Sequence, residues 1–172
     1  MSPTPHDQYV PLFSHALEGM ALSLETAEAF FREHPVPVDQ LMKTRIYPEM
    51  FPFELQLQIS ASHPARLAER LGVENAPLHE SPPADLAEAI ARMRAVKAFM
   101  EALPRAIFDE AGNREIVHRF HSGNEVRFNG LGYIGEWVLP NFFFHKTVAY
   151  LILRSLGVPV TKKIYMGGHL PA

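Results

Sequence analysis

The feature that most constrains the fold is an uninterrupted apolar stripe near the start of the chain. Its members recur in alternating steps of three and four positions: Val10, Phe13, Leu17, Met20, Leu24, Ala27 and Phe31. This spacing places all of them on one face of an α-helix. The helix is expected to end before Pro35 and Pro37, which forbid its continuation. A long helix with a single apolar face needs other elements to cover that face.

Three further long helices are predicted downstream. They cover residues 52–71, 82–103 and 131–156. Gly72 and Gly157 are typical of helix C-terminal stops, because glycine readily adopts the left-handed conformation that ends a helix. Ser81 is expected to cap the third helix, with Pro82 in its first turn. A shorter helical turn, capped by Asp39, is expected over residues 40–46.

Between the third and fourth long helices the pattern changes from helical to extended. Residues 114–120 and 125–128 read as two short strands joined by a turn at residues 122–124, which predicts a small β-hairpin. The fold class is therefore all-α, an antiparallel four-helix bundle with a hairpin between its third and fourth long helices. The 172 residues are expected to form a single domain, 1–172, with an irregular tail from residue 161. The second link is long, which leaves the neighbour order and handedness open.

Composition excludes several classes of function. The net charge is −3 and no block of Lys and Arg appears, so nucleic acid is not an expected partner. There is no cysteine, which excludes disulfides and thiolate metal sites and fits a cytoplasmic location. No apolar run reaches the roughly 18–20 residues of a membrane span, and no signal peptide is recognised. Phosphate-binding and dinucleotide-binding glycine motifs are also absent from the sequence.

Two polar residues interrupt the apolar stripe of the fourth helix. That stripe consists of Ile134, Val138, Asn141, His145, Val148 and Ile152. Asn141 and His145 lie four positions apart, so they are expected on one helix face, directed into the bundle. Buried polar groups need partners. The pair is either a hydrogen-bonded element next to the helix break at Pro140, or part of a ligand or metal site between helices.

His63 is the natural third contributor, because it borders the core edge of the second helix. The phase of His15 directs it away from the core, and His118, His121 and His169 are expected at the surface or in the tail. The run of Phe residues at 142–144 covers most of a helix circumference, so not all three can face one core. At least one is expected to contact the hairpin or a second subunit, which favours a homodimer.

Several motifs resemble an uncharacterised bacterial and fungal domain family of the DinB/YfiT-like superfamily. They are Met50-Phe-Pro, Gln56-x-Gln-Ile-Ser-Ala-x-His63, and Leu139-Pro-Asn-Phe-Phe-Phe-His145-x-Thr-x-Ala-Tyr with Gly157-Val-Pro159. The resemblance implies a DinB-like four-helix bundle, often dimeric. It also implies a divalent metal, typically zinc or nickel, held by a second-helix histidine and a His-x-x-x-His pair. Some members of the superfamily are thiol-dependent transferases.

Carried over to this chain, the metal residues would be His63, Asn141 and His145, with Asn141 in place of one histidine. Two hypotheses follow. Either the bundle binds a small ligand or a divalent metal between its helices, or it is a non-catalytic structural or regulatory dimer with a buried polar network. A catalytic version of the first would need a thiol from outside, because the chain has none.

Overall fold

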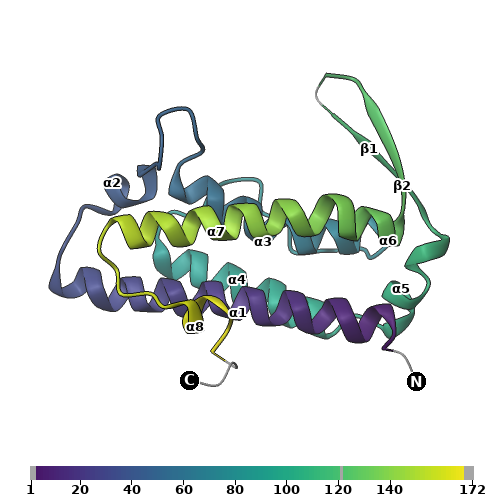
Figure 1. The fold of residues 1–172 in the computed structure, drawn as a ribbon, viewed down its shortest axis with the longest axis horizontal. Coiled ribbons are helices and arrows are strands. Elements are labelled where there is room, and N and C mark those ends of the chain that lie inside the picture. Colours follow the sequence, from purple (N-terminus) through teal and green to yellow (C-terminus); the bar gives the residue numbers. More distant parts are fainter. Residues whose placement is uncertain (1–2, 121, 169–172) are drawn as a thin grey trace.

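The computed structural model describes residues 3–120 and 122–168, and most of these are helical (Figure 1). Four long helices form a bundle: α1 (Pro5–Glu33), α3 (Phe53–Arg70), α4 (Leu86–Glu101) and α7 (Leu139–Ser155). Shorter helices are α2 (Val38–Lys43), α5 (Arg105–Asp109), η1 (Ala111–Asn113), α6 (Gly130–Gly132) and α8 (Lys162–Tyr165). The predicted bundle is confirmed. Among the described residues, no helix is long and apolar enough to cross a membrane.

The bundle consists of two antiparallel helix pairs. Helix α1 packs on α4, and α3 packs on α7, with further contacts between α3 and α4. Both α3 and α4 end at the side of the molecule where α1 begins, so these two neighbours run in the same direction (Figure 1). The long link over residues 71–85 makes this arrangement reachable, because it returns the chain along the bundle before α4 starts.

The predicted stripe of α1 is buried along its length, and Phe13, Leu17 and Leu24 are at most 1% exposed. Phe13 meets Phe142 of α7 edge to face, with ring centroids 5.6 Å apart. Such a contact adds to the apolar burial that dominates the stability of a bundle. Thr4 caps α1 by accepting a hydrogen bond from the backbone N–H of Asp7, in a reciprocal capping box.

Three local predictions differ from the structure. Helix α4 starts at Leu86 rather than at Pro82, because Asp85 accepts the Glu88 N–H at 2.8 Å while Arg92 binds the Ser81 carbonyl at 2.6 Å. Helix α2 spans Val38–Lys43, and no side chain caps it, so the expected cap by Asp39 is wrong. The tail contains the short helix α8, which Thr161 caps, while residues 169–172 lie outside the described residues.

The β-hairpin is confirmed close to its predicted bounds. Strand β1 (Glu115–Arg119) pairs antiparallel with β2 (Glu125–Asn129), with Val117 opposite Arg127. The chain then enters α7 through α6 and a π-helical segment, η2 (Tyr133–Val138). In that segment the Leu139 N–H donates to the Ile134 carbonyl five residues earlier. This wider turn stands immediately before Pro140, which has no N–H to donate.

Candidate paired-histidine site

Two imidazoles meet between α3 and α7. The rings of His63 and His145 lie 6.1 Å apart between centroids and are tilted by only 24°. His145 is 9% exposed, and His63 is half-buried at the edge of the same interface. The two residues come from helices that run antiparallel and are packed along their length. The structure therefore brings together two of the three residues predicted for a metal site.

Gln56 fixes the orientation of the His145 ring. The Nδ1 atom of His145 lies 2.7 Å from Oε1 of Gln56, and Nε2 of Gln56 donates to the Phe51 carbonyl at 2.9 Å. Because Oε1 is an acceptor only, His145 donates from Nδ1, which leaves the lone pair on its Nε2. Gln56 is 1% exposed and was not predicted. Its spacing of seven residues from His63, on one helix face, is the signal that could have revealed it.

Phe51 covers one side of the pair. Its ring is nearly parallel to that of His145, with centroids 6.4 Å apart, and it remains 51% exposed. Phe51 belongs to the loop between α2 and α3, and the Gln56 hydrogen bond holds the backbone of that loop against the bundle. The histidine pair therefore has a loop residue, rather than a helix, as its outer cover.

Both imidazoles are uncharged at neutral pH. Burial, followed by the neighbouring His145, Arg66 and His118, lowers the pKa of His63 to about 4. Burial also lowers the pKa of His145 to about 4. Desolvation opposes the charged form of an imidazole, and a second imidazole beside it acts in the same direction. At neutral pH the site thus presents uncharged rings that can accept hydrogen bonds.

The Asn141 side chain bonds to the backbone of the preceding segment η2 rather than to the histidine pair. Its Nδ2 donates to the Trp137 carbonyl at 2.7 Å, and its side chain is half-buried. Phe142, rather than Asn141, is the fully buried residue at this level of the helix. The π turn before Pro140 shifts the phase of the helix, which the regular spacing of the sequence did not anticipate. The amide group therefore stabilises the helix next to the proline, one of the two roles the sequence left open.

These residues are a poor fit to a closed metal centre. Zinc sites in proteins use three or four His, Cys or carboxylate ligands. Among the described residues, no group of three or more His, Cys, Asp or Glu side chains is placed to hold a metal ion. His63 and His145 are two such groups, and asparagine is a weak ligand for zinc or nickel.

Four other histidines, whose places were expected from the sequence, are distributed as follows. His15 is exposed, as its phase predicts. His118 was expected at the surface, but it is half-buried against Trp137, with ring centroids 4.2 Å apart. Burial, followed by the charge of Arg70, lowers the pKa of His118. His121 and His169 lie outside the described residues.

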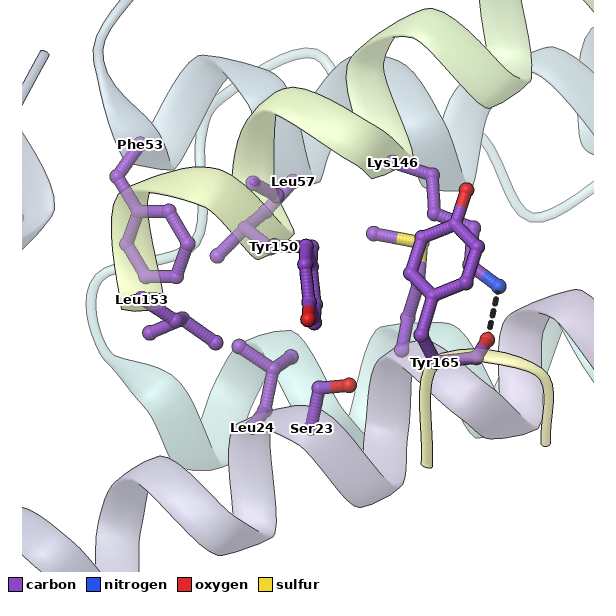
Figure 2. A pocket seen from close by; sticks show the side chains of 10 residues that line it. Ser23, Leu24, Phe53, Leu57, Lys146, Tyr150, Leu153 and Tyr165 are labelled. Carbon is purple, nitrogen blue, oxygen red and sulfur yellow. Dashed lines mark hydrogen bonds between the residues drawn. The ribbon is translucent and has the colours of Figure 1, made fainter. Parts of the chain in front are cut away.

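Sequence reasoning also missed a buried lysine, Lys146, which follows His145. It is 2% exposed, and its Nζ donates to the Tyr165 carbonyl of α8 at 2.6 Å. Burial lowers its pKa to about 7. It lines a small cavity between α1, α3, α7 and α8 (Figure 2). Successive residues of a helix point about 100° apart, so His145 faces α3 while Lys146 faces α1 and α8.

Comparison with known proteins agrees with the fold. Residues 6–166 match the family model of a domain of unknown function, DUF1993. The chain is also similar to the crystal structure of a DinB family member protein from Shewanella denitrificans. The TM-score is 0.83 at 31% sequence identity, over 97% of this chain and 93% of that one. No curated protein matches the chain.

Proposed function

This chain belongs to the family of the domain of unknown function DUF1993 and has a DinB-like fold, and we propose that it binds a small ligand between α3 and α7. The ligand is recognised by the uncharged imidazoles of His63 and His145, under the cover of Phe51. The observation that carries this proposal is the close pairing of two desolvated histidines with a fixed tautomer on one of them. Histidines whose pKa is strongly lowered by burial, and which meet between two helices, are typical of functional sites.

The two histidines differ in the hydrogen-bond partners that the chain offers to their ring nitrogens. His145 has Gln56 as a partner on Nδ1, whereas no hydrogen bond to a described residue engages the ring nitrogens of His63. A ligand hydroxyl could donate to the free Nε2 of His145, and an aromatic body would stack on Phe51 as His145 itself does. A small aromatic alcohol is therefore a suitable probe of the site.

A divalent metal such as zinc or nickel is the second proposed occupant. Neutral imidazole is an ordinary ligand for both ions. With His63 and His145 as ligands and Asn141 as the weak third contributor, several coordination positions would remain for water or an external thiol. We derive no reaction step from such a metal, because the donor set among the described residues is incomplete.

The test compares probes on protein purified without a histidine tag. Zinc, nickel and phenol are titrated by calorimetry into the unmodified chain and into His63→Ala, His145→Ala and the control His15→Ala. We expect at least one probe to bind, with at least tenfold loss in the first two variants and no change in the control. If neither metal nor phenol binds, or if His15→Ala weakens binding equally, the proposal is wrong.

The alternative is a non-catalytic dimer in which the polar groups are a structural network. It is favoured by the hydrogen bonds that Gln56 and Asn141 make within the chain. Exposed apolar side chains beside the site also favour it, since Phe51 and Phe144 are 51% and 55% exposed. In that case His145→Leu changes stability, and no probe raises the melting temperature of either protein.

A further inference from the structure

Lys146 is a buried lysine without a counter-ion. Burial lowers its pKa to about 7, so its charged and neutral forms are both populated at neutral pH. Its ammonium group carries three donors, and the structure supplies one carbonyl, that of Tyr165 at 2.6 Å, and the face of the Tyr165 ring at 4.0 Å from its centroid. Among the ion pairs of the described residues, none involves Lys146. Burying an ammonium group without an anion is costly, so an anion that reached this position would be strongly favoured.

The surroundings of Lys146 leave room for one small group. The cavity beside it measures about 10 Å³, which is the space of about one water molecule. Tyr150 lies one helical turn further along α7 and lines the same cavity. Its hydroxyl donates to the Val160 carbonyl at 3.5 Å, the long limit of a hydrogen bond. Figure 2 shows both side chains extending from α7 toward α1.

An open groove adjoins this cavity. It has a volume of about 280 Å³ and is lined by Thr147, Tyr150, Lys162 and Tyr165. Tyr150 and Tyr165 border both spaces, so a molecule in the groove is separated from Lys146 only by these two rings. The groove lining contains a lysine and no carboxylate. Its aromatic walls and positive charge suit an anion with an apolar or aromatic body.

We propose that the cavity and groove between α7 and α8 form a binding site for a small aromatic or aliphatic carboxylate. One carboxylate oxygen takes the water-sized space beside Lys146 and accepts a hydrogen bond from its Nζ. The apolar body lies between Tyr150 and Tyr165 in the groove, with Lys162 at the rim. This site is on the other side of α7 from His63 and His145, and it does not depend on the function proposed for them.

The site requires a small displacement of α8. This helix covers the cavity, and it is held by the Lys146 hydrogen bond and by a 2.8 Å contact between the hydroxyls of Thr147 and Tyr165. It is only four residues long. A carboxylate would replace the Tyr165 carbonyl as partner of the ammonium group, and charge-assisted hydrogen bonds are stronger than those to a neutral carbonyl.

The test uses benzoate and benzamide, which share a shape and differ in charge. Each is titrated into the full chain labelled with ¹⁵N, and amide chemical shifts are followed. We expect saturable shifts for benzoate around residues 143–150 and 161–166, with benzamide at least tenfold weaker. Lys146→Met, which keeps the volume but loses the charge, should reduce benzoate affinity at least tenfold, whereas Lys43→Met on α2, whose side chain is 66% exposed, should leave it unchanged.

Several outcomes would overturn the proposal. These are equal binding of benzamide, shifts scattered over all five lysines, and unchanged benzoate affinity in Lys146→Met. Equal shifts with potassium chloride would show only adventitious anion binding. If Lys146→Met fails to fold, Lys162→Met replaces it, because it removes the positive charge at the rim of the groove. A several-fold loss of benzoate affinity is expected in that variant. Unchanged benzoate affinity, together with equal binding of benzamide, would contradict the site.

Discussion

At the scale of single residues, Gln56 links three parts of the candidate site. Its amide joins the His145 ring to the Phe51 carbonyl, so Gln56→Leu leaves a buried imidazole N–H and a carbonyl without partners. Unsatisfied buried groups cost about 1–3 kcal/mol. We expect the free energy of unfolding, measured by urea denaturation, to fall by about that amount. Gln40→Leu on the exposed face of α2 is the control, with a change within about 0.5 kcal/mol. Equal effects of the two substitutions would deny Gln56 this role.

The histidine pair also predicts how stability depends on pH. Both folded pKa values lie at about 4, below the value of about 6.5 for an unfolded chain. Between these values the unfolded state binds more protons, so stability is lost as pH falls from 6.5 toward 4. A loss on the order of 3 kcal/mol is expected for each of the two histidines. Arg66 and His118, which face His63, act in the same direction.

Urea unfolding at a series of pH values between 4 and 7 measures this loss. His63→Phe keeps an aromatic ring at the interface but removes one titrating group, so its stability should vary less with pH over the same range. His15→Phe, at an exposed position, should reproduce the profile of the unmodified chain. A His63→Phe profile as steep as that of the unmodified chain would show that the acid sensitivity has another origin.

At the scale of elements, α7 depends on the side chain of Asn141 next to its proline. The bond from Asn141 to the Trp137 carbonyl compensates for a helix that widens into a π turn before Pro140. Asn141→Leu should therefore lower the free energy of unfolding by about 1 kcal/mol. Zinc and phenol titrations of the same variant separate the two roles of Asn141. Unchanged stability with lost binding would make Asn141 a ligand residue rather than a helix-stabilising one.

Helix α8 packs against α1 at Gly19. A Cβ atom at Gly19 would lie 2.3 Å from the Tyr165 carbonyl oxygen and 2.9 Å from the Gly167 nitrogen, both backbone atoms. Gly19→Ala should therefore displace α8 and accelerate amide hydrogen exchange over residues 162–168 by at least tenfold. Gly135→Ala is the matched control, because its Cβ would meet no atom within 4 Å. Equal amide protection of residues 162–168 in both variants would contradict this close packing of α8 on Gly19.

The elements differ in how far the sequence predicts them. The stripe of α1 is regular, and its burial follows directly from the spacing. The start of α4 is not predictable from Ser81 and Pro82 alone, because the side chain of Arg92, ten or more residues later, holds that segment out of the helix. The pairing of His63 with His145 is a contact between distant helices. The place of His63 at the core edge of its helix made it a candidate, and the family resemblance grouped it with His145. Periodicity alone places a residue on a face but not opposite a partner.

At the scale of the whole molecule, α7 organises both candidate sites. It packs on α3 through His145 and reaches α1 and α8 through Lys146. The two residues are adjacent, and each is buried without an acidic partner among the described residues. The bundle has therefore placed two desolvated basic groups on different sides of one helix. Each makes one hydrogen bond within the described residues, His145 to Gln56 and Lys146 to the Tyr165 carbonyl.

The association state is the remaining prediction at this scale. Phe144 and Phe51 flank His145, at 5.2 and 6.4 Å between ring centroids, and both are more than half exposed. Tyr47 and Ile46 of the same loop are 60% and 44% exposed. Exposed apolar groups on neighbouring segments are typical of protein interfaces. We expect a homodimer at micromolar concentration in analytical ultracentrifugation.

Phe144→Glu should convert that dimer to a monomer, because a charge buried at the interface would lack a partner. Val126→Glu on the hairpin is the control, since Val126 is also exposed, at 40%, but is remote from His145 in the sequence and belongs to a different element. Circular dichroism of both variants verifies that each is folded. Sedimentation of the unmodified chain as a monomer at all micromolar concentrations would reject the dimer. If the Phe144→Glu protein stays dimeric while the Val126→Glu protein dissociates, the dimer interface lies on the hairpin instead.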